Sequence, residues 1–501
     1  MITHRRGHNF QSVGSRLLVK EEIECDKINK SLGKYLDQLG EEHKDVSPGD
    51  MSSSKDLKYG VDMIDHYSIH NLKYLYPHWL YDVCIYLVYN FKGFFGLYVM
   101  NILICSLGAY IVYKFYEDDK FFGLIFGILF IILLGVNITA RSQSISYIIF
   151  LLEIINIEKF IKTGRNKYLV FLFMLLLLLF NTHMAMYPVF YVIFIPYFAE
   201  YLISLTKLNK NKEFKFTNYE IEKNKHIKKL FIFMILSIFT AILTPIGMKN
   251  TLEYIFYNKG GEMIKYIKEH RALTLLETPQ FCSVLFATLV SSLFLNIRFK
   301  LRDVFMLLGF LLLSFMGERN ISLFYIIWVL LFGRTIVNYV KKYDNKTIEN
   351  ITKLILKYSI CYLLIIFIIL INFLKNNDSK YLSTKMYPIK ATEYIKENLD
   401  YKNIRIFNEY NFGSYLLFND IKVFIDSRAD LYEKNFNHSK RSIVEDAMEI
   451  NRKNYNEIFE YYDITHILLY NTNFICDYLK KDKNYKIIYK DERYLLFERK
   501  V

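Results

Sequence analysis

A short segment from Asp65 to Asp82 concentrates side chains that could do chemistry. It reads DHYSIHNLKYLYPHWLYD and stands just before a long apolar run. A carboxylate such as Asp65 beside an apolar bundle can serve as a general base or as a metal ligand. His78 and Trp79 could contact a substrate, but Trp and Tyr also favour the headgroup zone of a bilayer and would anchor an interfacial helix there. Both interpretations of this pair stay open.

Short turns between apolar runs carry a second group of candidates. Arg141 stands in NITARSQSISY, His183 in LFNTHMAMYP, and Glu318 and Arg319 in GERNIS. Ionisable residues at helix ends are commonly just solvated. These turns, however, fall on one side of a membrane if every apolar run crosses once, so their side chains could line one cavity. The two arginines would suit a phosphate there, through bidentate hydrogen bonding.

The loop 248–280 falls on the same side and is long enough to cover such a cavity. It carries Arg271, a candidate for substrate binding, together with Glu262, Glu269 and His270.

A third group lies near the C-terminus, where FIDSRADLY places Asp426, Arg428 and Asp430 directly after an expected strand. Strand ends in α/β sheets are favoured ligand sites, so Asp426 and Arg428 are candidates for substrate binding. The alternative is an internal salt bridge that organises the loop, and this is the interpretation that we favour.

The composition indicates that a membrane bundle positions these residues. The chain has 501 residues, 53% of them hydrophobic and 17% aromatic, and the apolar residues gather into long runs. Much of the net charge of +14 lies in short loops between those runs, where it sets orientation; a nucleic-acid partner is not expected. The six cysteines form no CxxC pair, so neither a disulfide framework nor a zinc site is expected.

Since about 20 residues are needed to cross a bilayer, the apolar runs predict about ten spans. They lie near residues 94–113, 121–137, 143–161, 168–183, 185–205, 228–247, 281–296, 303–316, 321–340 and 354–374.

Basic stretches orient these spans. They are 159–167, 207–229, 298–302 and 334–353. All share one side, which the positive-inside tendency assigns to the cytoplasm. The candidate turns and the C-terminal region then lie outside, in a multi-pass protein of the cell membrane.

The fold class predicted is an α-helical polytopic membrane protein with a C-terminal extracytoplasmic α/β domain. Its four regions are a polar N-terminal segment expected to be disordered (1–58), a first outer loop with an interfacial helix (59–93), the transmembrane bundle (94–374) and the α/β domain (375–501). In that domain we predict helices at 388–399 and 439–462, and strands at 404–410, 422–426, 465–471, 485–491 and 494–499.

The motifs and their order resemble those of bacterial membrane proteins of the C-type glycosyltransferase superfold, which includes the polyprenyl-phosphate-sugar-dependent transferases. The resemblance covers roughly residues 60–500 and rests on DHYS, PHWLYD, ARSQ, NTH, TPIG, GERNISLF and NFGSYLLF…KVFIDSRADLY.

This resemblance implies an outer active site, a polyprenyl-phosphate-linked sugar donor and an envelope glycan or protein as acceptor. Asp65 would deprotonate the acceptor hydroxyl or help to hold a divalent metal ion. Arg141, His183 and Arg319 would stabilise the departing lipid phosphate.

Members of the superfold usually begin with a membrane span followed closely by an acidic residue, and no span is expected here before residue 59. An active transferase and a copy inactivated by the missing span therefore both stay open. Two other classes are an envelope lipid or glycan transporter or flippase, and a non-catalytic membrane scaffold. Transporters usually show paired half-bundles and spans broken by Gly or Pro, neither of which is found.

Overall fold

The computed structural model describes most of the chain between residues 65 and 500. The described residues are 65, 67–73, 75, 77–116, 119–135, 137–206, 219–256, 265–266, 270–295, 297–343, 387–437 and 439–500. The N-terminal segment 1–58, the run 354–374, Glu262 and Glu269 lie outside them.

The chain divides into two compact units. One, the bundle unit, comprises Tyr98–Met248 and Ile267–Asn376; the other, the sheet unit, comprises Met1–Leu97, Lys249–Tyr266 and Asn377–Val501.

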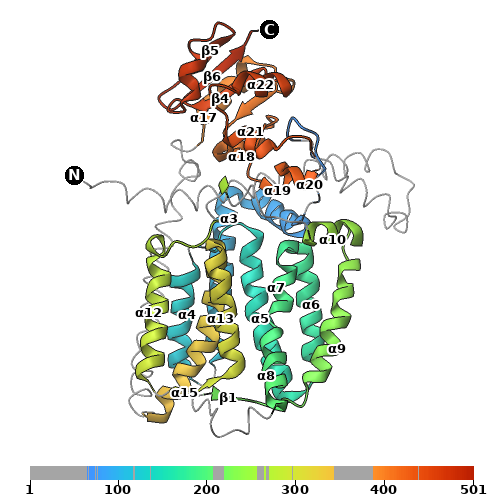
Figure 1. Cartoon of the computed structure of the whole chain (residues 1–501), viewed down its shortest axis with the longest axis vertical. Coiled ribbons are helices and arrows are strands. Elements are labelled where there is room, and N and C mark those ends of the chain that lie inside the picture. The colour runs from blue at the N-terminus through green and yellow to red at the C-terminus, as the bar shows by residue number, and fades with distance from the viewer. Residues whose placement is uncertain are drawn as a thin grey trace, which may run out of the picture. The chain divides into compact units, whose positions relative to one another are not determined.

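The bundle unit consists of helices that run side by side (Figure 1). Its α-helices are the second part of α3 (Trp79–Phe115), then α4 (Lys120–Leu134), α5 (Ser142–Thr163), α6 (Lys167–Thr182), α7 (Tyr187–Val192), α8 (Ile195–Leu205), α9 (Ile227–Ser237), α12 (Pro279–Phe294), α13 (Leu301–Met316), α14 (Ile321–Ile327) and α15 (Gly333–Tyr343). Shorter elements are η2 (Met184–Met186), η5 (Ile238–Ile242), η7 (Leu275–Glu277), η8 (Glu318–Asn320), the π-helical η9 (Trp328–Phe332) and the paired strands β1 (Tyr219–Glu220) and β2 (Phe299–Lys300).

In the described part of the chain, three helical stretches have the length and apolar character needed to cross a membrane. They are Phe95–Phe115, Met184–Leu205 and Glu318–Lys342, and α4, α6 and α12 are shorter apolar helices. The prediction of a mainly helical protein is thereby confirmed, and these helices suggest membrane association, whereas about ten spans stays a prediction.

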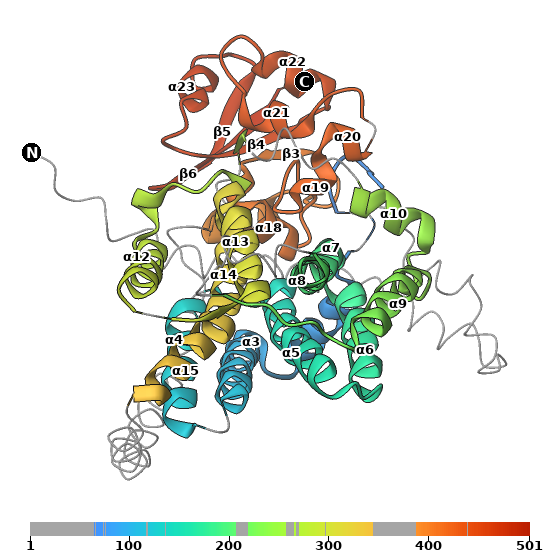
Figure 2. The same cartoon turned by 60° about the horizontal axis from the view of Figure 1, so that its bottom comes forward.

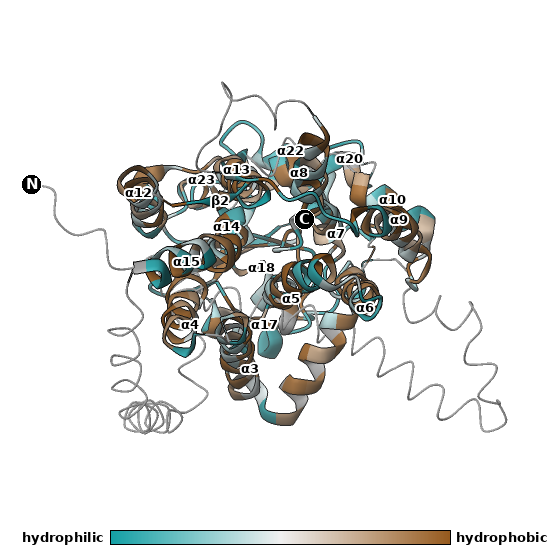
Figure 3. Cartoon of the chain, turned by 90° about the horizontal axis from the view of Figure 1, so that it is seen from below, coloured by the Kyte–Doolittle hydropathy of each residue, from teal (hydrophilic) through white to brown (hydrophobic). Residues whose placement is uncertain are grey.

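The outer surfaces of these helices are apolar. Hydrophobic ribbon dominates the bundle unit in Figure 3, and large side chains such as Val170, Ile232 and Phe294 are exposed. Exposed apolar surface of this extent marks contact with a membrane or with another protein. By contrast α5 is buried along most of its length and packs against α6 and α14.

The sheet unit holds a four-stranded sheet of order β3-β4-β6-β5, in which β3 and β4 are parallel and the other neighbours antiparallel. The strands are β3 (Ile406–Asn408), β4 (His466–Tyr470), β5 (Tyr485–Lys490) and β6 (Tyr494–Arg499). The helices are the first part of α3, α10 (Met248–Phe256), α17 (Ile389–Asn398), α18 (Tyr410–Phe418), α19 (Ala429–Tyr432), α20 (Lys434–Asn437), α21 (Ile443–Met448), α22 (Tyr455–Tyr461) and α23 (Ile475–Leu479).

Alternation along the strands builds two apolar cores, one on each face of the sheet. Phe407 and Ile467 point into the core shared with α21, α22 and α23, and Figure 2 shows α21 and α22 beside the sheet. Ile406 and Leu468 point into the core shared with α17 and α18. The result is an α/β arrangement of the kind predicted for the C-terminal region.

Two details of the prediction are wrong. The helix expected at 439–462 is broken into α21 and α22, because Asn451 and Asn454 form a local turn in which the Asn451 amide donates to Asn454 Oδ1 at 2.6 Å. The strand expected at 422–426 is reduced to one bridge, formed by Val423 with Ser68.

Candidate functional site

The segment that begins at Asp65 belongs to the fold of the sheet unit. Ser68 and Val423 form a parallel bridge, the Ile69 amide donates to the Val423 carbonyl at 3.0 Å, and the Val423 amide donates to the Tyr67 carbonyl at 3.1 Å. The sequence assigned this segment and the C-terminal domain to separate regions, but within the sheet unit they share a backbone pairing.

Asp65, Asp426 and Arg428 form a buried group, which we call the carboxylate–arginine triad. Arg428 Nη1 donates to Asp65 Oδ1 at 2.7 Å, and Arg428 Nη2 donates to Asp426 Oδ2 at 2.6 Å. The Tyr432 hydroxyl donates to the same Asp426 oxygen at 2.8 Å. Burial alone would lower the pKa of the Arg428 guanidinium, but Asp426 and Asp65 outweigh it and raise that pKa, so the group stays charged.

The triad holds Asp65 firmly. Its side chain is 0% exposed, and its Oδ2 accepts from the Ser68 amide at 2.9 Å while its Oδ1 also accepts from the Tyr67 amide at 3.2 Å. The contact between Asp426 and Arg428 is the internal salt bridge that we favoured from the sequence. A role for Asp65 as a base or metal ligand stays a prediction, and either role would require it to exchange these partners.

His70 and Arg405 join this region and were not among the sequence candidates. His70 Nε2 donates to the Phe424 carbonyl at 2.8 Å, and Arg405 Nη1 donates to the Ile69 carbonyl at 3.3 Å. Burial lowers the pKa of His70 to about 4, so the ring is neutral at pH 7. No local signal distinguishes His70 from its neighbours, since its role depends on a strand-like segment far away in sequence.

His78 and Trp79 stand where α3 begins. Trp79 is partly buried against the apolar core beneath α21 and α22. The structure therefore gives Trp79 a packing role, and its contact with a substrate or a membrane interface stays a prediction.

In the bundle unit, Arg141 and His183 lie at neighbouring helix ends. Arg141 directly precedes α5 and His183 directly follows α6. A hydrogen bond of 2.8 Å joins His183 Nδ1 to the Ser146 hydroxyl, and so ties the end of α6 to the start of α5.

Arg319 and Glu318 lie in η8, the turn between α13 and α14. Arg319 Nη1 donates to His270 Nε2 at 3.3 Å, and the Glu318 amide donates to the Arg271 carbonyl at 3.3 Å. The bundle unit thus brings the segment around Arg271 to the η8 turn. We call Arg141, His183, His270, Glu318 and Arg319 the turn cluster.

The members of the turn cluster lie at one end of the bundle. Arg302 in the first turn of α13 binds Glu158 near the end of α5, so the start of α13 meets the end of α5. A helix of 16 residues such as α13 is about 24 Å long, which carries η8 to the opposite end, the end where α5 begins. The turns that carry these residues therefore lie at one end of the bundle unit, and whether this end faces the outside stays a prediction.

The other end of the bundle holds an ionic cluster that sequence reasoning missed. Arg302 Nη1 donates to Glu200 and Glu222 at 2.8 Å each, and Arg334 donates to Glu158 and Asp303 at 2.7 Å each. The sequence counted both arginines as basic loop residues. Acidic residues at the ends of three expected spans were a signal that could have revealed these pairs.

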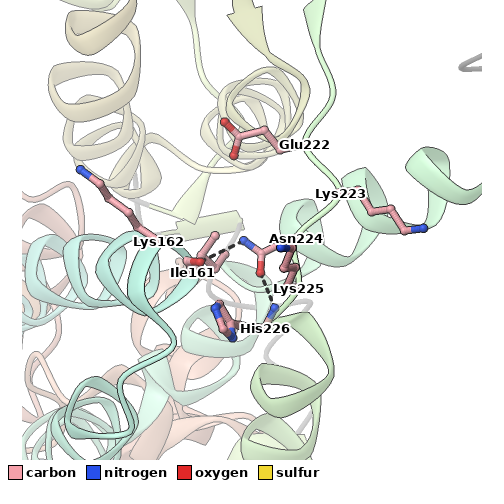
Figure 4. A pocket seen from close by; sticks show the side chains of 7 residues that line it. All are labelled: Ile161, Lys162, Glu222, Lys223, Asn224, Lys225 and His226. Carbon is pink, nitrogen blue, oxygen red and sulfur yellow. Dashed lines mark hydrogen bonds between the residues drawn. The ribbon is translucent and has the colours of Figure 1, made fainter.

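A cavity of about 350 Å³ opens at this same end, and none of the predicted site residues lines it. Figure 4 shows the lining residues: Ile161, Lys162, Glu222, Lys223, Asn224, Lys225 and His226. The Lys162 and Lys223 ammonium groups point away from its centre, so the basic side chains do not converge on one point. Among the described residues, no group of three His, Cys, Asp or Glu side chains could hold a metal ion.

No family model matches the chain. An uncharacterised 38.4 kDa protein of Clostridium perfringens is 40% identical over 67 residues, 13% of this chain and 20% of that protein. An uncharacterised protein of C. perfringens strain 13 is 42% identical over 60 residues, 12% of this chain and 18% of that protein. The chain thus spans about one fifth of the length of the curated relatives it matches, and their names carry no activity.

Proposed function

We propose that the protein is a membrane glycosyltransferase that moves a sugar from a polyprenyl-phosphate carrier to an envelope acceptor. The observation that supports this best is the turn cluster, which gathers Arg141, His183 and Arg319 at one end of an apolar bundle. Cationic groups with planar donor sets bind phosphate oxygens well, and lipid-facing helices beside them suit a polyprenyl chain.

The proposal includes a topology. About ten spans cross the membrane, the turn cluster lies at the outer face, and the C-terminal domain is extracytoplasmic. The basic stretches near the ionic cluster support this orientation, since positive charge favours the cytoplasmic side.

The proposed reaction is a displacement at the anomeric carbon of the donor sugar. The acceptor hydroxyl oxygen forms a bond to that carbon while the bond from the carbon to the phosphate oxygen breaks. The hydroxyl proton passes to a carboxylate base, and the carrier leaves as a polyprenyl phosphate with one more negative charge. Arginine side chains placed at that phosphate stabilise the charge as it develops.

The test compares polyprenyl-phosphate lipids by mass spectrometry in cells that lack the gene and in complemented cells. We expect a sugar-linked carrier to accumulate on deletion, to clear when the intact gene is restored, and to persist with Arg319→Gln. Arg298→Gln is the matched control, because Arg298 is exposed and follows α12 near the other end of the bundle.

Two results would overturn the proposal. An unchanged lipid and glycan profile, with the protein expressed, would favour a non-catalytic scaffold. A sugar-linked carrier that accumulates on the cytoplasmic face alone would favour a transporter or flippase.

A further inference from the structure

Glu153 is a buried carboxylic acid in the interior of the bundle unit. It lies near the middle of α5, is 0% exposed, and stands among the buried side chains Phe150, Ile154 and Ile157. Within the described part of the chain, neither of its carboxyl oxygens has a hydrogen-bond partner. An ionisable residue inside a membrane bundle is costly to keep, and such residues commonly mark an ion or proton pathway.

The ionic cluster provides the contrast. Glu158, five residues further along α5, accepts hydrogen bonds from both Arg302 and Arg334. These guanidinium groups allow Glu158 to stay ionised in a buried place. No cation among the described residues pairs with Glu153 in this way, and an unpaired buried carboxylate avoids the cost of its charge by taking a proton.

Polar hydroxyl groups lie beside Glu153. The Tyr191 hydroxyl of α7 is close enough to interact electrostatically with the Glu153 carboxyl. Tyr191 donates to the Tyr187 hydroxyl at 3.0 Å and shares a 3.2 Å hydrogen bond with the Ser237 hydroxyl at the end of α9. Hydroxyl groups both donate and accept, so this series can pass a proton along.

The two helices that pack most extensively on α5, α6 and α14, bring no charged side chain to the level of Glu153. Between Tyr168 and His183, α6 has no titratable side chain, and the only one in α14 is Tyr325. Of the titratable groups on these two helices and on α7, Tyr191 is the one that interacts electrostatically with Glu153.

We propose that Glu153 is a proton-binding site that holds an exchangeable proton inside the bundle. Release moves the proton from the carboxyl oxygen to water and leaves a carboxylate within electrostatic range of the Tyr191 hydroxyl. Proton occupancy thus sets the charge in the middle of α5. The inference does not depend on the transferase proposal, since Glu153 belongs to neither the turn cluster nor the ionic cluster.

Dicyclohexylcarbodiimide tests the site in the full-length protein in native membranes, because it modifies protonated carboxyls in apolar surroundings. Peptide mass spectrometry should find the adduct on Glu153, with a yield that falls as pH rises, and should find none on Glu158 or Glu200. Glu153→Gln should lose this adduct. The matched control Glu220→Gln, which changes an exposed acid in β1, should keep it.

Three outcomes would overturn the inference. The first is no adduct on Glu153 in protease-resistant, folded protein, and the second is an adduct yield that does not change with pH. The third is an adduct yield that sodium ions suppress at constant pH, because this would assign the site to a metal cation. If Glu153→Gln does not fold, the pH series on the unaltered protein still decides. Infrared spectroscopy gives an independent readout, because a protonated carboxyl has a carbonyl stretching band. In Glu153→Asp this band should be replaced by a shifted one.

Discussion

The Arg428 guanidinium donates a hydrogen bond to Asp65 across 363 positions of sequence. This contact, together with the bridge between Ser68 and Val423, makes the segment at residues 65–70 a structural part of the sheet unit. A change at Asp65 therefore acts on the stability of that unit as well as on any chemistry. Loss of activity in such a variant has to be compared with a direct measurement of folding.

Asp65→Asn should destabilise the sheet unit by about 3 kcal/mol, the low end of the range for breaking a buried ion pair. The low end is expected because Asp426 still pairs with the positive charge of Arg428. Hydrogen–deuterium exchange of the full-length protein should show faster exchange at residues 67–70 and 422–428. Lys73→Gln is the control. It breaks an exposed pair with Glu253 and should cost less than about 1 kcal/mol. Equal effects of the two variants would contradict the assigned role of the triad.

His70 should make the sheet unit less stable in mild acid. The pKa of His70 is lowered from 6.5 to about 4 in the folded protein, so between these values the unfolded chain binds a proton that the folded chain does not. The contribution of His70 to the free energy of unfolding is fully present above pH 6.5. It is lost as the pH decreases toward 4, by at most about 1.4 kcal/mol per pH unit. Exchange rates measured between pH 7 and pH 5, corrected for intrinsic exchange, should show this slope in the native protein. The same slope in His70→Gln would show that another group is responsible.

The sheet could be predicted from sequence because its signals are local. Runs of consecutive apolar residues in HILLY and YLLFER locate β4 and β6, and each strand buries side chains in both cores of the sheet unit. The pairing of Ser68 with Val423 left no such pattern, since a single bridge between distant segments needs no periodicity. The apolar residues of KVFID predicted a strand at 422–426, and nothing in the sequence showed that this strand would be only one bridge to Ser68.

The candidate site was predictable only in part, for a related reason. His183 and Arg319 were selected as charges at helix ends, and the short connections of the bundle place such ends together. The partners of Arg302 were missed although acidic residues stand at the ends of three expected spans, because the sequence does not show which of these ends meet. The sequence of a loop does not distinguish a charged residue that is solvated from one that pairs with a buried residue in the folded protein.

Gly413→Ala should destabilise the sheet unit strongly. A Cβ atom at this position would lie 1.9 Å from the Ile425 carbonyl oxygen, which is backbone and cannot rotate away. We expect a cost of about 3 kcal/mol or more from this overpacking, measured as lost protease resistance of the C-terminal region. Gly309→Ala in α13 is the matched helical control, because a Cβ there has nothing within 4 Å and Ala favours a helix. A tolerated Gly413→Ala would show that α18 can move away from residue 425.

Arg302→Gln should lower the melting temperature of the detergent-solubilised protein, while Arg298→Gln should leave it nearly unchanged. Arg302 is buried and donates to three carboxylates, so its removal leaves Glu200 without its arginine and Glu158 with Arg334 alone. Breaking a buried ion pair by removing one partner costs about 3–5 kcal/mol. A second change, Glu200→Gln, should recover part of that cost because it removes the carboxylate left unpaired. If the double variant melts below Arg302→Gln, the two side chains do not stabilise each other as their contact indicates.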